Sequence, residues 1–160
     1  MRKLSRKWHR YKDDDGKSQV FRVFISHGRS MLRNRVKRYV EEELNFATEI
    51  LVEKFAGSII FDKLENNTWD CDCAVVIMTP DDPQPGRKTF RARQNVIHET
   101  GYLQGLFQDR ELVVILKEKS VEWFTNVYGI EFIEFEGRQI SAVFPKLRQA
   151  LGDIYKWYNS

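Results

Sequence analysis

Hydrophobic positions follow two alternating spacings along the chain from residue 20 onward. Short runs rich in β-branched and aromatic residues predict strands at 20–26, 48–54, 73–79, 111–117 and, more weakly, 130–135. Segments with helical spacing separate these runs, at 31–44, 59–67, 91–105 and 141–158. Three prolines and a glycine make 80–90 a predicted loop.

The helical segments are amphipathic, as surface helices packed on a sheet should be. In 31–44 one stripe contains Leu32, Val36, Val40 and Leu44. Ser58 is a plausible N-cap for the helix at 59–67. Regular strand–helix alternation predicts an α/β fold with a five-stranded parallel sheet, strand order 2-1-3-4-5, and helices on both faces.

Charge is concentrated at the N-terminus, although the net charge of the 160 residues is only +3. The basic residues there are Arg2, Lys3, Arg6, Lys7, Arg10 and Lys12, followed by three aspartates at 13–15. The remainder is nearly neutral, so we do not expect a nucleic-acid partner. We expect residues 1–19 to form a basic, flexible tail and 20–158 to form one domain.

Metal, disulfide and membrane chemistry find little support in the sequence. Cys71 and Cys73 are the only cysteines, and we expect both to be reduced thiols. The three histidines, His9, His27 and His98, have no ligand spacing, so no metal site is expected. Without a signal peptide or an apolar run of about 20 residues, a cytoplasmic location off the membrane is expected.

The predicted strand order also predicts where a ligand binds. Ligands of such sheets bind at the carboxyl ends of the strands where the order reverses, here between the first and third strands. The segments that follow those strands are SHGRS at 26–30 and TPDD at 79–82. Gly28 permits close backbone approach, and Arg29 offers a charge-assisted contact to a phosphate. A plain polar turn is an equally good interpretation of 26–30.

The helix at 91–105 contains one carboxylate in unusual company. With spacings of four, four and three, we expect one face to contain Arg91, Asn95, Glu99 and Tyr102. The opposing, packed stripe is then Val96, Thr100, Leu103 and Phe107. Gly101 and Gly105 are expected to let this helix lie close on the sheet. Most helical glutamates are simply solvated, but this one lies near the crevice that the topology selects.

A single carboxylate restricts the chemistry that this crevice supports. Without a histidine or cysteine partner it is too little for acyl transfer, and neither a P-loop nor a GxGxxG motif is present. One carboxylate is sufficient, however, to assist cleavage of an N-glycosidic bond whose leaving group is already cationic. Nicotinamide in NAD⁺ is such a group, and the transition state resembles an oxocarbenium ion.

Three motifs, VFISHGRS, AVVIMTPDD and RARQNVIHETGYLQG, strongly resemble the bacterial TIR-like (Toll/interleukin receptor-like) nucleotide-binding domains. The resemblance covers about residues 20–155 and implies a flavodoxin-like TIR sheet. It also implies NAD⁺ hydrolase activity in anti-phage defence, with no cofactor besides NAD⁺ as substrate. Such domains accompany cyclic-nucleotide sensors, including STING-type ones, and act when self-associated. The chain offers no evident room for a sensor, which is then another polypeptide or another part of a longer protein.

The resemblance assigns roles residue by residue. The family's catalytic glutamate falls on Glu99. The positions matching its nucleotide-binding segments are Ser26, His27, Gly28, Arg29, Asp81, Asp82, Arg91, Arg93, Gln94 and Asn95. His98 and Thr100 depart from the family pattern, and His98 is expected to be simply exposed.

Two other functions stay open from the sequence. One is a non-catalytic TIR-like module that only binds a nucleotide or self-assembles, for which a carboxylate at position 99 has no use. The other is a nucleoside glycosylase or deoxyribosyltransferase, which also uses a single carboxylate on a similar sheet. Choice of substrate separates the latter from an NAD⁺ hydrolase.

Overall fold

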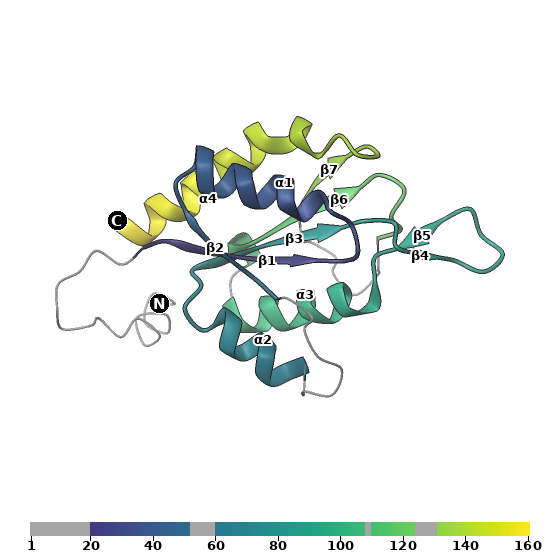
Figure 1. Ribbon diagram of the computed structural model, residues 1–160, viewed down its shortest axis with the longest axis horizontal. Helices are drawn as coiled ribbons and strands as arrows, with labels where there is room; N and C mark the ends of the chain where they lie inside the picture. Colours follow the sequence, from purple (N-terminus) through teal and green to yellow (C-terminus); the bar gives the residue numbers. More distant parts are fainter. Residues whose placement is uncertain (1–19, 52–59, 108–109, 124–130) are drawn as a thin grey trace.

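The computed structural model describes residues 20–51, 60–107, 110–123 and 131–160. The tail at 1–19, the Ser58 cap and the end of the second predicted strand lie outside the described residues. Five parallel strands form one sheet: β1 (Arg22–His27), β2 (Ala47–Ile50), β3 (Cys73–Met78), β6 (Val113–Glu118) and β7 (Phe132–Phe135). Their order, β2-β1-β3-β6-β7, confirms the predicted order 2-1-3-4-5 (Figure 1).

The sheet is buried through its centre because helices cover both of its faces. All six residues of β3 are buried, which accounts for its continuous apolar run. In the register, Val75 lies opposite Ile25 on one side and Val114 on the other. These strands form the floor on which both helical layers pack.

Helices cover both faces of the sheet (Figure 1). One layer contains α1 (Leu32–Arg38), which continues as a π-helical turn at Tyr39–Glu43, and α4 (Phe144–Asn159). The other contains α2 (Ile60–Thr68) and α3 (Gln94–Phe107). The predicted stripe of α1 is buried at Leu32, Val36 and Val40, whereas Leu44 is only partly buried.

Two predicted elements begin later than expected because a 3₁₀ turn precedes each of them. The fourth sheet strand begins at Val113, because Arg110–Leu112 form a 3₁₀ turn. The last helix likewise begins with a 3₁₀ turn at Ile140–Val143 and becomes α-helical from Phe144, with Pro145 in its first turn.

The predicted loop at 80–90 contains a hairpin. Its strands β4 (Asp82–Pro83) and β5 (Phe90–Arg91) pair antiparallel, with Asp82 opposite Arg91. Gly86 has φ +72° within the connection, a conformation that favours glycine. Because Arg91 lies in β5, it does not share a helical face with Asn95 as predicted.

The contact of α3 with the sheet differs from the prediction. Gly101 and Gly105 are exposed, and a Cβ atom added to either would meet no described atom within 4 Å. The helix instead packs through the buried residues Val96, Glu99, Thr100, Leu103 and Phe107. The expectation that the glycines bring the helix close to the sheet is therefore wrong.

The cysteines are free thiols, as predicted. Burial raises the pKa of the Cys71 thiol to about 12, so it stays protonated at neutral pH. Within the described ranges, no helix is long and apolar enough to cross a membrane. The same residues contain no cluster of three or more His, Cys, Asp or Glu side chains placed to hold a metal ion.

Candidate active site

A pocket of about 340 Å³ opens where β1 and β2 end. The residues after β1, the first turn of α1 and the start of α3 complete its wall. The lining residues are Ile25, Ser26, His27, Gly28, Arg29, Arg33, Ile50, Leu51, Arg93, Asn95 and Glu99. The pocket thus brings together seven of the residues assigned from the sequence, drawn from segments far apart in the chain.

Glu99 lies on the inner side of α3, with only 7% of its surface exposed. With Val96, Leu103 and Phe107 it forms a stripe at spacings of three, four and four, which faces the sheet. This corrects the prediction that Glu99 lies opposite the packed stripe. Burial of a carboxylate is costly unless polar groups donate hydrogen bonds to it.

Ser26 supplies one such group. Its hydroxyl, at the end of β1, donates a 2.5 Å hydrogen bond to Oε2 of Glu99. Ser26 is itself only 1% exposed, so the two side chains hold one another in a fixed position. The bond orients the carboxylate at the pocket.

The backbone after β1 is held by Asp81, which follows β3. One oxygen of Asp81, Oδ2, accepts from the Arg29 N–H at 3.2 Å, and Oδ1 accepts from the Thr79 hydroxyl at 3.1 Å. A Cβ atom on Gly28 would lie 1.8 Å from Oδ2, so glycine is required for this arrangement. Asp81 therefore ties two loops together from outside the pocket lining.

His27 is oriented by the same turn. Its Nδ1 lies 2.7 Å from the carbonyl oxygen of Gly28. A carbonyl oxygen only accepts, so this contact places the hydrogen on Nδ1 when the ring is neutral.

The charged wall of the pocket is mainly basic. The guanidinium groups of Arg29, Arg33 and Arg93 line it, beside the carboxylate of Glu99. Arg33 also donates to the carbonyl of Ser30 at 3.2 Å. Sequence reasoning missed Arg33; its place in the first turn after the SHGRS loop is the signal that points to it.

The remaining assigned residues lie elsewhere. Asp82 and Arg91 are cross-strand neighbours in the hairpin, and Gln94 is exposed at the start of α3. None of them, nor Asp81, lines the pocket. His98 is exposed on α3, as expected. The Thr100 hydroxyl donates to the Val96 carbonyl at 2.6 Å, which satisfies a polar group within the packed stripe.

The parallel sheet with its reversal of strand order at β1 and helices on both faces defines a doubly wound, flavodoxin-like α/β domain. Residues 22–137 match the family described as "CAP12/Pycsar effector protein, TIR domain". The chain belongs to this family.

Two relatives share about a third of their aligned residues with the chain. The uncharacterized protein YuaY of Escherichia coli (strain K12) is 32% identical over 133 residues, covering 76% of this chain and 44% of YuaY. Protein tirC of Dictyostelium discoideum is 33% identical over 103 residues, covering 58% of this chain and 51% of tirC. The chain thus spans about half the length of these relatives.

A solved structure shares the fold at low sequence identity. The CMP N-glycosidase BcmB of Clostridium botulinum superposes with a TM-score of 0.51 at 12% identity. The match covers 79% of this chain and 96% of BcmB.

Proposed function

We propose that this TIR domain hydrolyses the N-glycosidic bond between nicotinamide and ribose in NAD⁺, with Glu99 as the catalytic carboxylate. The observation that supports this most is the placement of Glu99: buried, hydrogen-bonded by Ser26, and at the wall of a 340 Å³ pocket. A buried anion fixed beside a cavity is suited to stabilise a cation that forms there.

The proposed reaction needs one carboxylate. The bonding electrons between C1′ and the pyridinium nitrogen move to that nitrogen, so nicotinamide leaves neutral and needs no general acid. The Glu99 carboxylate stabilises the positive charge that develops on C1′ and the ring oxygen. Water then adds to C1′ and loses a proton, giving ADP-ribose, nicotinamide and H⁺.

The rest of the lining suits a dinucleotide. The guanidinium groups of Arg29, Arg33 and Arg93 match the two negative charges of a diphosphate. Asn95, one turn before Glu99, offers an amide to a ribose hydroxyl. The apolar residues at the ends of β1 and β2 offer a surface for the nicotinamide ring.

We also propose the cellular setting that the family suggests. As a member of the CAP12/Pycsar effector TIR family, the domain would act in anti-phage defence, in the cytoplasm, on a cyclic-nucleotide signal. Activation by self-association is part of this proposal. A sensor would then lie in another polypeptide or in a further part of the protein.

A nucleoside monophosphate is the rival substrate, because BcmB is a CMP N-glycosidase. Cytosine bound to ribose is neutral, so its departure calls for protonation of the base. Among the described residues that line this pocket, Glu99 supplies the one carboxylate, which favours a leaving group that is already cationic. The other rival is a non-catalytic module that binds a nucleotide or self-assembles.

Nicotinamide release from NAD⁺ by concentrated protein tests the proposal, with assembly followed by light scattering. The wild type, Glu99→Gln and Glu118→Gln are compared; the last removes a buried carboxylate outside the pocket. We expect release by the wild type and Glu118→Gln alone. Cytosine release from CMP in place of nicotinamide release assigns the rival substrate. No release by an assembled wild type supports the non-catalytic module, and equal release by all three proteins removes Glu99 from the mechanism.

A further inference from the structure

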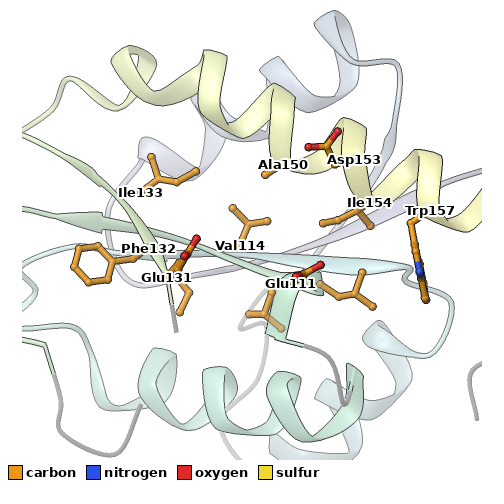
Figure 2. Close-up of a pocket in the computed structure, with 12 residues that line it drawn as sticks. Glu111, Val114, Glu131, Phe132, Ile133, Ala150, Asp153, Ile154 and Trp157 are labelled. Atoms are coloured by element: carbon orange, nitrogen blue, oxygen red, sulfur yellow. The ribbon is translucent and has the colours of Figure 1, made fainter. Parts of the chain in front are cut away.

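A second cavity lies at the opposite edge of the sheet from Glu99. This groove, of about 600 Å³, opens at the amino ends of β6 and β7, beneath the last turns of α4 (Figure 2). Val114 of β6 and Ile133 of β7 contribute to its apolar surface, with Ala150 and Ile154 of α4 above them. The small side chain of Ala150 leaves space between the helix and the edge of the sheet.

Among the described residues, the charged ones that line this groove are acidic: Glu111, Glu131 and Asp153. Figure 2 shows Asp153 on the helix and the two glutamates on the strand side. Two large aromatic side chains also border it and are partly exposed, Phe132 at 38% and Trp157 at 43%. Oδ1 of Asp153 lies 3.8 Å from Nζ of Lys156. Because both side chains are exposed, this ion pair contributes little to stability. The surface fits a segment that is both basic and aromatic.

The chain's own N-terminal sequence has this composition. Residues 1–12 contain no acidic residue, and their basic residues are Arg2, Lys3, Arg6, Lys7, Arg10 and Lys12. The same segment contains the apolar residues Leu4, Trp8 and Tyr11, at spacings of four and three. The segment is thus complementary to the groove in both charge and apolar character.

The segment also joins the domain beside the groove. Phe21, just before β1, is buried, and its ring centroid lies 5.4 Å from that of Tyr155 and 5.9 Å from that of Tyr158. These tyrosines belong to the same turns of α4 as Ile154 and Trp157, which line the groove. At about 3.3 Å per residue, residues 13–20 can span about 26 Å.

We propose that residues 1–12 bind in this acidic groove of their own domain. The basic side chains contact Glu111, Glu131 and Asp153, and the apolar side chains cover the surface around Val114 and Ile154. Covalent attachment beside the groove gives the segment a high effective concentration, which favours the chain's own segment over that of a second copy. Because the groove lies at the amino edge of the sheet, this binding leaves the Glu99 pocket open.

Carbodiimide coupling of the full chain, which joins a lysine amine directly to a carboxylate, tests the contact. An equimolar mixture of normal and nitrogen-15 protein distinguishes links within one chain from links between two chains. We expect links from Lys3, Lys7 or Lys12 to Glu131 or Asp153, all within one chain. Amide hydrogen exchange in residues 2–12 should be slowed at least about tenfold relative to an unstructured peptide, and added salt should reduce this protection.

A charge-reversal variant sharpens the test. Glu131→Lys with Asp153→Lys should abolish the protection, and adding Lys3→Glu, Arg6→Glu and Lys7→Glu should restore it. The matched control is Glu65→Lys with Asp70→Lys, which makes the same charge change at exposed positions around the end of α2. If circular dichroism shows that the reversal disturbs folding, Glu131→Gln with Asp153→Asn replaces it.

Three outcomes would overturn the proposal. The first is exchange of residues 2–12 at the rate of an unstructured peptide in the wild type. The second is equal protection in the groove variant and its control. The third is cross-links between light and heavy chains, which would assign the groove to a second copy.

Discussion

Two glutamates are buried to the same degree and lie in different surroundings. Glu118, 6% exposed at the end of β6, accepts hydrogen bonds from the Ser120 amide at 2.7 Å, the Ser120 hydroxyl and the Gly137 amide at 2.9 Å. Burial alone raises the pKa of Glu118, but these hydrogen bonds outweigh it, and the pKa lies below its ordinary value. This carboxylate joins the turns that follow β6 and β7.

Glu99 is equally buried, but it faces a cavity. Its Oε2 accepts the Ser26 hydroxyl, and the pocket beside it has a basic wall. The comparison teaches that burial does not distinguish a structural carboxylate from a candidate catalytic one. What distinguishes them is whether backbone amides enclose the charge or a ligand can reach it.

The largest expected effect separates the two glutamates by activity. Glu99→Gln should lower kcat for nicotinamide release about 10³-fold, because a neutral amide does not stabilise the developing cation. Glu118→Gln, measured per folded molecule, should keep kcat within about twofold of the wild type. Steady-state kinetics on assembled protein check both. A similar loss in both variants would mean that Glu118 also serves the reaction or that folding limits the assay.

Ser26→Ala tests how far the position of Glu99 depends on its serine partner. Loss of a buried hydrogen bond to a charged group is worth about 1.5–3 kcal/mol, which corresponds to about 10–100-fold in kcat. KM should change little, because Ser26 acts through Glu99. Ser26→Thr, which keeps a hydroxyl, should recover most of the rate. A rise in KM with kcat unchanged would instead assign Ser26 to substrate binding.

Glu118→Gln should affect stability, and the effect should depend on pH. At pH 7 we expect a loss of about 1–3 kcal/mol in the free energy of unfolding, measured with urea. Because the pKa of Glu118 is lowered on folding, its stabilisation is present above the ordinary value and is lost as the pH falls through the lowered one. The gap between wild type and variant should therefore narrow below about pH 4.5. A gap that does not depend on pH would contradict this account.

Gly28→Ala extends the comparison to Asp81, which is held by loop groups much as Glu118 is. The new methyl group would displace the Asp81 carboxylate from the Arg29 amide and the Thr79 hydroxyl. We expect a loss of about 1–2 kcal/mol in unfolding free energy. A double-mutant cycle with Asp81→Ala should show that the two losses are not additive. Full additivity would show that Gly28 does not act through Asp81.

The smallest effect is expected on the outer face of α3. Gly101→Ala and Gly105→Ala should each stabilise the domain by about 0.5–1 kcal/mol, because alanine loses less backbone entropy in a helix and its Cβ meets no described atom within 4 Å. Activity should not change, since Glu99 faces inward from the same helix. Destabilisation by either substitution would mean that the face is covered.

The sequence predicted the sheet well, because its signals are local or short in range. The apolar run at 73–79 has the length of a buried strand and is too short for a packed helix. Residues with a strong turn preference follow it. Strand–helix alternation then favoured the doubly wound order 2-1-3-4-5, which is the observed order. The motif with Glu99 also directed attention to the edge of the sheet where the pocket lies.

The site itself was predicted less completely. Helical spacing does not say which face of α3 turns toward the sheet, so Glu99 was placed on the face opposite the packed stripe. The hairpin at 82–91 depends on pairing between two-residue strands, which no periodicity reveals. Because of this hairpin, Arg91 lies in a strand and not in α3, and Asp82 does not line the pocket.

By itself, the sequence determined the five strands of the main sheet, their order, the helices that cover them and the presence of Glu99 near the carboxyl edge. Only the tertiary structure decided that Ser26 and Glu99, which are 73 residues apart, share a hydrogen bond. It alone showed that Arg33 lines the pocket and that Asp81 accepts a hydrogen bond from the backbone amide of Arg29. The physical reason is that hydrophobic periodicity records burial along each element, whereas the rotation of a helix on a sheet is set by packing between distant segments.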